Sequence, residues 1–249
     1  MNKLNFLGLM LATLLSSAVF AFSTVDEQID SYLNTLETAD DVTKSKMLER
    51  LQWSGLRDER LYDVIEDEVL ALYQTSGMGK VEFKTYLLHI RALGYSGNEK
   101  YRATLDQVRV EADGRKARKI AKRALDNLNQ FVVWNEKIAN SDAGMTGKSA
   151  EITAYMKMLN VDDPAVQRMA AKAVYHTQLM DEDLLKLVAD KLIAIYWKDG
   201  LSKIEQDVAA WFCKALGQSG KPEFRTLLTT VTENTPYKKI KKYARKYAG

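Results

Sequence analysis

The chain has 249 residues, with 36 Lys and Arg against 33 Asp and Glu, and a formal net charge of +3. Its single cysteine, Cys213, excludes an internal disulfide, so stability must come from packing. Three prolines and many Ala, Leu, Lys and Glu favour helix over sheet. The near balance of charge excludes neither an acidic nor a neutral partner.

Residues 1–21 have the pattern of a signal peptide. Lys3 supplies a positive start, residues 6–15 form a short apolar run, and small residues precede Ala21. The run is too short to span a bilayer as a mature helix. The sequence therefore predicts cleavage after Ala21 and a periplasmic or secreted protein, with a retained N-terminal anchor as the alternative.

Three helix pairs are expected next. The predicted helices cover 26–37, 42–55, 58–74, 79–95, 98–111 and 114–127. Asp40 and Asp58 stand where an N-cap is needed. Gly94 is expected to end a helix in the left-handed conformation, and Ser96 to cap the helix that follows.

Residues 129–148 are expected to connect two halves. The apolar stretch 131–134 is predicted to pack between them, and residues 140–144 read as a loop or hinge.

An internal duplication organises the whole chain. Residues 26–126 align with 149–249 at a constant offset of 123, without a gap and with about a quarter of the positions identical. Asp163 with Pro164, Asp181, Gly217 and Ser219 repeat the signals of the first copy. We therefore predict an all-α, right-handed α-solenoid of about six helix pairs, divided into a first half over 22–128, the connecting segment 129–148 and a second half over 149–249.

A family resemblance rests on two stretches. The first reads ALGYSGNEKYRATLDQV…RKARKIAKRAL, and its echo reads ALGQSGKPEFRTLLTTV…KKIKKYARKYA. They resemble HEAT repeats of the kind found in phycobilisome-lyase-like proteins, and the mature chain is similar to small exported bacterial HEAT-repeat proteins of unassigned activity. The resemblance implies a stack of helix pairs and a binding surface. Its lyase members would imply a bilin chromophore, but no lyase motif is present, nor the His-Glu pairs of metal-binding HEAT enzymes.

The duplication indicates structural roles for the residues that could otherwise carry chemistry. His89 aligns with Phe212, His176 with Trp53, and Cys213 with Ile90, which favours packing roles. Ser96 and Ser219 lack the Gly-x-Ser-x-Gly pattern of a nucleophile elbow. An acidic cluster is expected to be a solvated helix face; it consists of Asp58, Glu59, Asp63, Glu66, Asp67 and Glu68. Arg102 and Arg225 are expected to pair with Asp67 and Asp190 between repeats.

The distribution of charge carries the functional hypothesis. The first helices of the pairs sum to about −9 and −2 in the two halves, and the second helices to about +8 in each. In a HEAT stack the second helices line the concave face. The candidate partner-binding residues are Arg115, Arg118, Lys119, Lys122, Lys238, Lys239, Lys242 and Lys246. Their alternative role is solvation of an exposed helix.

We therefore predict a non-enzymatic exported scaffold that binds a protein or peptide, one with acidic segments, on a basic concave face. No catalytic, metal or cofactor site and no nucleic-acid partner are expected. Two alternatives are electrostatic contact with anionic envelope lipid or polysaccharide, and a lyase-like or cofactor-handling protein.

Overall fold

The computed structural model describes residues 22–248, and the predicted signal peptide over 1–21 lies outside the described residues. Helices are the only regular elements in this range. The α-helices are α1 Val25–Thr38, α2 Asp41–Ser54, α3 Glu59–Leu72, α4 Lys80–Tyr95, α5 Arg102–Glu111, α6 Arg115–Ala139, α7 Ala150–Asn160, α8 Pro164–Thr177, α9 Glu182–Ile195, α10 Lys203–Gln218, α11 Pro222–Asn234 and α12 Lys238–Ala248. A short 3-10 helix, η1 Glu99–Tyr101, precedes α5. The predicted all-α fold of HEAT-like helix pairs is confirmed.

The duplication appears in the backbone. Helices α8, α9 and α10 begin and end 123 residues after α2, α3 and α4. The predicted N-caps are confirmed, since Asp40 accepts from Thr43 N–H at 2.7 Å and Asp163 from Ala165 N–H at 2.9 Å. Left-handed residues recur at the same offset: Gly97 has φ +59° and Gly220 has φ +67°.

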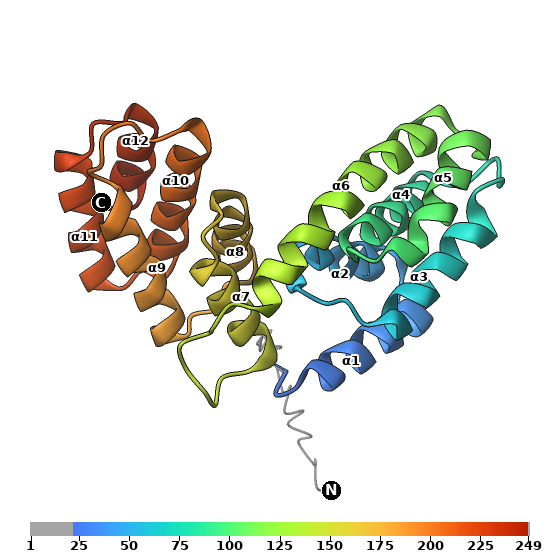
Figure 1. The fold of residues 1–249 in the computed structure, drawn as a ribbon, viewed down its shortest axis with the longest axis horizontal. Helices are drawn as coiled ribbons and strands as arrows, with labels where there is room; N and C mark the ends of the chain where they lie inside the picture. The colour runs from blue at the N-terminus through green and yellow to red at the C-terminus, as the bar shows by residue number, and fades with distance from the viewer. Residues whose placement is uncertain (1–21, 249) are drawn as a thin grey trace, which may run out of the picture.

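The first copy departs from the second at its last helix. The helix expected over 114–127 continues as α6 to Ala139, so the first eleven residues of the predicted connecting segment are helical. At about 1.5 Å per residue, its 25 residues span roughly 37 Å. Figure 1 shows α6 running from the far end of one arm to the middle of the molecule. This length returns the chain to the start of the second copy.

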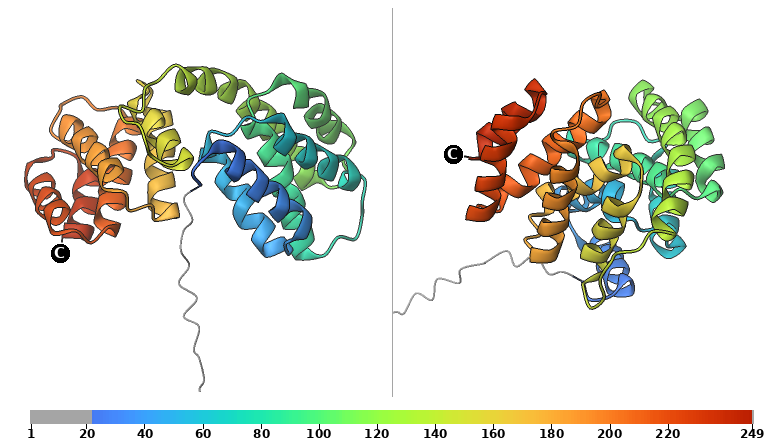
Figure 2. Two further views of the ribbon diagram at one scale, coloured as in Figure 1. Left: turned by 90° about the horizontal axis from the view of Figure 1, so that it is seen from below. Right: turned by 60° about the vertical axis from the view of Figure 1, so that its left-hand side comes forward.

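The two halves meet through equivalent helices. Helix α2 packs on α8 and α1 on α7, so the first pair of one copy faces the first pair of the other. Trp53 stacks on His176, its counterpart at offset 123, with ring centroids 5.4 Å apart. The two arrays therefore extend outward from a shared centre, as in a two-fold interface, and Figure 2 shows α1 and α2 beside α7 and α8 in the middle.

A row of even-numbered helices forms the inner layer. Helices pack in the order α6, α4, α2, α8, α10 and α12 across both halves. In Figure 1, α6 on one arm and α8 and α10 on the other lie toward the space between the arms, while α3, α5, α9 and α11 lie away from it. Each half has its own cluster of buried apolar side chains, the first between Ile29 and Leu128 and the second between Ile138 and Ala244.

Gly94 and Gly217 do not end helices in the left-handed conformation, so that expectation is wrong. Neither has a positive φ; both lie inside the last turn of α4 or α10. A Cβ on Gly94 would lie 2.5 Å from Ala124 O of α6, and one on Gly217 would overlap Tyr247 of α12. The glycines are therefore needed for close helix contact.

Candidate functional site

The predicted basic residues lie on the last helix of each half. Within residues 22–248, α6 stands at one end of the row of even-numbered helices and α12 at the other. Arg115, Lys119 and Lys122 are exposed, as are Lys238, Lys242 and Lys246. The two sets lie at opposite ends of the inner row, and the structure does not bring them together.

Four predicted residues share one groove. Arg115, Arg118, Lys119 and Lys122 line an open groove of about 640 Å³ between α5 and α6. Arg109 of α5 adds a fifth cation that the sequence did not point out, and its guanidinium also contacts Asp106 at 2.9 Å. The groove has one carboxylate in its lining, Asp126, so cations dominate it.

Two of the predicted residues have structural partners. The Arg118 guanidinium donates to the carbonyls of Ala112 and Asp113, at the end of α5. It therefore satisfies carbonyls that a helix C-terminus leaves free. Lys239 contacts Asp207 at 2.6 Å.

Charge separates by layer in the structure as well. Within the observed bounds, the even helices carry about +8 in each half, and the odd helices about −8 and −2. The inner row is thus basic, and the outer helices of the first half are acidic.

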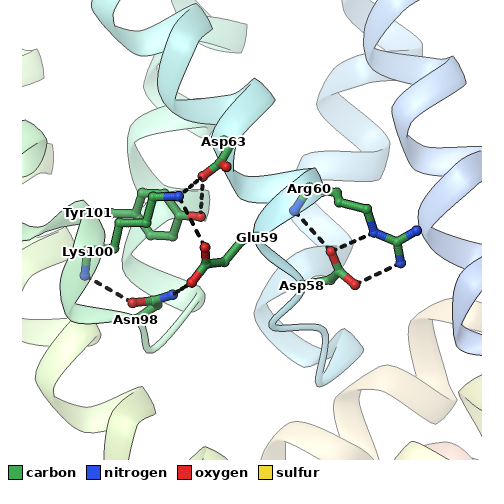
Figure 3. A network of polar contacts seen from close by, with 7 residues as sticks. All are labelled: Asp58, Glu59, Arg60, Asp63, Asn98, Lys100 and Tyr101. Atoms are coloured by element: carbon green, nitrogen blue, oxygen red, sulfur yellow. Dashed lines mark hydrogen bonds and ion pairs between the residues drawn. The ribbon is translucent and has the colours of Figure 1, made fainter.

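The acidic cluster on α3 is partly an inter-repeat contact, not only a solvated face. Lys100 reaches back to Asp63 at 2.7 Å and to Glu59 at 3.2 Å, and Tyr101 donates to Asp63 at 2.8 Å (Figure 3). Asp58 instead pairs with Arg60 at 2.8 Å. These contacts hold η1 against α3, and the Glu59 and Asp63 side chains still remain 57% and 45% exposed to solvent.

The expected arginine ladder is wrong for the first copy. Arg102 pairs with Glu99 at 2.5 Å and donates to Asn129 instead of reaching Asp67. Arg225 and Asp190 make no ion pair among residues 22–248. Lys100 takes the inter-repeat role in the first half.

Sequence reasoning missed a group of aromatic rings and lysines on the inner face of the second half and of the adjoining helix α2. We call it the aromatic–lysine row: Trp53 of α2, Tyr175, His176 and Lys172 of α8, Trp211 and Lys214 of α10, and Tyr243 and Tyr247 of α12. Trp211 lies 5.6 Å from Tyr175 and 5.8 Å from His176 between centroids. Except for the exposed His176, its members are half-buried. Four helices therefore present one continuous surface.

Apart from Trp53, the row consists of residues of the second copy. At the equivalent positions the first copy has Leu88 for Trp211, Ile120 for Tyr243 and Ala124 for Tyr247. All three are buried there, so at these positions the inner helices of the first copy pack through aliphatic side chains instead of aromatic rings. The signal for the row in the sequence was this difference between two copies that otherwise match. It is missed when only the shared residues of the copies are compared.

The histidines, cysteine and serines behave as packing and turn residues. His89 is buried, and its Nδ1 lies 3.0 Å from Thr85 O. Burial lowers its pKa, although Glu68 of α3 and Asp41 of α2 oppose this effect; Lys44 adds to it. Burial raises the pKa of the Cys213 thiol to about 12. Ser96 and Ser219 each donate to a carbonyl of the preceding helix at 2.6 Å, so they brace its end and do not cap the next helix.

The connecting region contributes a cavity. Phe131 packs on Tyr95 and Trp134, with centroids 5.3 and 5.2 Å apart, and Trp134 reaches the second core. A cavity of about 570 Å³ lies nearby, between α1, the end of α2 with the loop that follows it, the end of α6 and α7. Among residues 22–248, no three His, Cys, Asp or Glu side chains gather as metal ligands. No helix of the same range is long and apolar enough to cross a membrane.

Comparison with known proteins gives likenesses of fold. No protein-family model matches the chain, and no curated protein matches it significantly. Human deoxyhypusine hydroxylase is 12% identical, with a TM-score of 0.36, covering 89% of this chain and 83% of its own. The CpcE–CpcF complex of phycocyanin lyase from Nostoc sp. is 13% identical, with a TM-score of 0.34; the match covers 88% of this chain and 93% of that chain. An engineered protein is 14% identical, with a TM-score of 0.31; the match covers 89% of this chain and 95% of that chain.

The expectation that the chain is not an enzyme is corrected by this comparison. Two of the three solved structures are a hydroxylase and a lyase, so a HEAT-like helical fold does not argue against catalysis. At these identities and TM-scores, no reaction, substrate or site residue passes from them to this chain. The HEAT-like fold rests on the paired helices of the structure itself and on their order of packing.

Proposed function

We propose that this chain is a repeat scaffold that binds an acidic segment of a protein partner on the basic surface of its even-numbered helices. The observation that supports the proposal best is the groove between α5 and α6, which is lined by five cations from two helices and by a single carboxylate. A surface of one sign attracts segments of the other and raises the rate of encounter.

The geometry also selects the residues that can report on binding. Lys119 and Lys122 are exposed and make no ion pair within residues 22–248, so their charges are free to meet a partner. Arg118 is unsuitable, because its replacement would also leave the end of α5 without its donor.

The test compares two charge reversals of equal size. Lys119→Glu with Lys122→Glu changes the groove, and Lys186→Glu with Lys191→Glu makes the same change on the outer helix α9. A fluorescent polyglutamate peptide is titrated at low salt against both variants and the wild type. The groove variant is expected to lose about tenfold in affinity, roughly 1.4 kcal/mol, and the α9 variant much less.

Equal losses in both variants would show that only net charge matters and would reject a located surface. Vesicles of anionic lipid serve as a second probe. If they bind through Lys119 and Lys122 while the peptide does not bind at all, the partner is an anionic lipid surface and the proposal is wrong.

A further inference from the structure

The aromatic–lysine row holds two ammonium groups against one indole ring. Lys214 Nζ lies 3.5 Å from the Trp211 ring centroid and Lys172 Nζ lies 5.3 Å from it. Lys214 is also 4.5 Å from the Tyr243 centroid and 6.0 Å from that of Tyr175. Rings from three helices therefore fix the position of this cation.

These cations lack negative partners. Neither Lys172 nor Lys214 makes an ion pair within residues 22–248. The carboxylate beside them, Asp207, already contacts Arg168 at 3.1 Å and Lys239 at 2.6 Å. Burial, Arg168 and Lys214 lower the pKa of Lys172, and Asp207 opposes them only in part, since the net direction is downward. Positive charge is thus concentrated over the rings, and an added carboxylate would relieve the repulsion.

We propose that Lys172 and Lys214 form an anion-binding site for a carboxylate of the acidic partner, and that the adjoining rings contact an apolar side chain of the same segment. This inference rests on the proposed function and names the chemistry of the segment: acidic residues around an aromatic or aliphatic anchor. Trp and Tyr are enriched at the energetic centre of protein interfaces.

The arrangement of the rings favours a peptide over a single-stranded nucleic acid. A base needs an open ring face on which to stack. Here one face of Trp53 is covered by His176, whose ring is inclined by only 6°, and Lys214 lies over Trp211. Ring edges and ammonium groups suit a carboxylate and a compact apolar side chain.

The first copy supplies variants with a low risk of misfolding. Trp211→Leu and Tyr243→Ile install the residues that the first copy already packs at these positions, Leu88 and Ile120. Trp197→Leu is the matched control, because Trp197 is 58% exposed and follows the outer helix α9. Lys214→Gln removes the central cation.

Two fluorescent peptides serve as probes: eight glutamates around a central Phe, and the same peptide with Ser in place of Phe. The Phe peptide is expected to bind wild type about tenfold more tightly than the Ser peptide. Trp211→Leu with Tyr243→Ile should abolish this difference, Lys214→Gln should weaken both peptides, and Trp197→Leu should change neither.

Each failure has a separate meaning. If the Ser peptide binds and responds to Lys119 and Lys122, but the Phe peptide gains nothing and ignores Trp211→Leu, this inference is wrong while the proposed function stands. If neither peptide binds wild type at low salt, the proposed function itself is wrong. A thymidine oligonucleotide of matched length is tested as well. If it binds wild type more tightly than the Phe peptide and Trp211→Leu abolishes this binding, the ligand of the row is a nucleic acid and the inference is wrong.

Discussion

Gly94→Ala tests how closely the inner helices pack. The added Cβ would lie 2.5 Å from Ala124 O and 2.8 Å from Ala124 Cα, and both atoms belong to the α6 backbone. Backbone atoms cannot rotate away, so α4 and α6 must separate, and we take the upper part of the usual range for overpacking, about 2–3 kcal/mol. Alanine returns up to about 1 kcal/mol of helix propensity. We expect a net loss of about 1–2 kcal/mol, or roughly 2–8 °C in melting temperature for a chain of this size.

The assay is thermal unfolding followed by circular dichroism and calorimetry. Gly79→Ser is the control, because Gly79 begins the same helix with negative φ and its Cβ would have no close neighbour. That variant should melt at or slightly above the wild-type temperature, since serine is a good N-cap. An unchanged or higher melting temperature for Gly94→Ala would refute the close-contact reasoning.

Three further predictions concern other parts of the chain. Native Cys213 should react slowly with a thiol reagent and rapidly after denaturation, because burial raises its pKa and blocks access; fast native labelling contradicts this. Because burial lowers the pKa of His89, the unfolded state binds more protons than the folded state. The contribution of His89 to the free energy of unfolding is therefore complete above about pH 6.5. At lower pH it decreases, by at most about 1.4 kcal/mol per pH unit. His89→Phe should flatten that slope in denaturant titrations between pH 7 and 5, and an unchanged slope would exclude His89. The mature protein should begin at Phe22 by N-terminal sequencing, and an intact Met1 would reject export with cleavage.

Helix positions were predictable because their signals are local. Caps such as Asp40 and Asp163 and the repeated apolar spacing predict helix starts to within a residue or two. The length of α6 was not predictable, because residues 129–148 align with no part of the second copy. The meeting of α2 with α8 could not be predicted either, since it depends on that same helix returning the chain to the centre.

The roles of single residues depended on contacts between distant segments. Gly94 has the sequence context of a helix end, but the nearness of Ala124 determines its role. The basic helices were evident from composition, whereas the groove they form with Arg109 required the packing of α5 on α6. Trp211 and Lys214 read as ordinary residues of α10 until the structure brings rings of α8 and α12 beside them.

The location of a bound acidic segment tests the account most directly. A glutamate-rich peptide with one photoreactive phenylalanine analogue is cross-linked to the wild-type protein, and the modified residues are identified by mass spectrometry. We predict adducts on α6, α8, α10 and α12, concentrated near Trp211. Adducts on the outer helices α3, α9 and α11, or adducts scattered without preference, would contradict binding on the inner row.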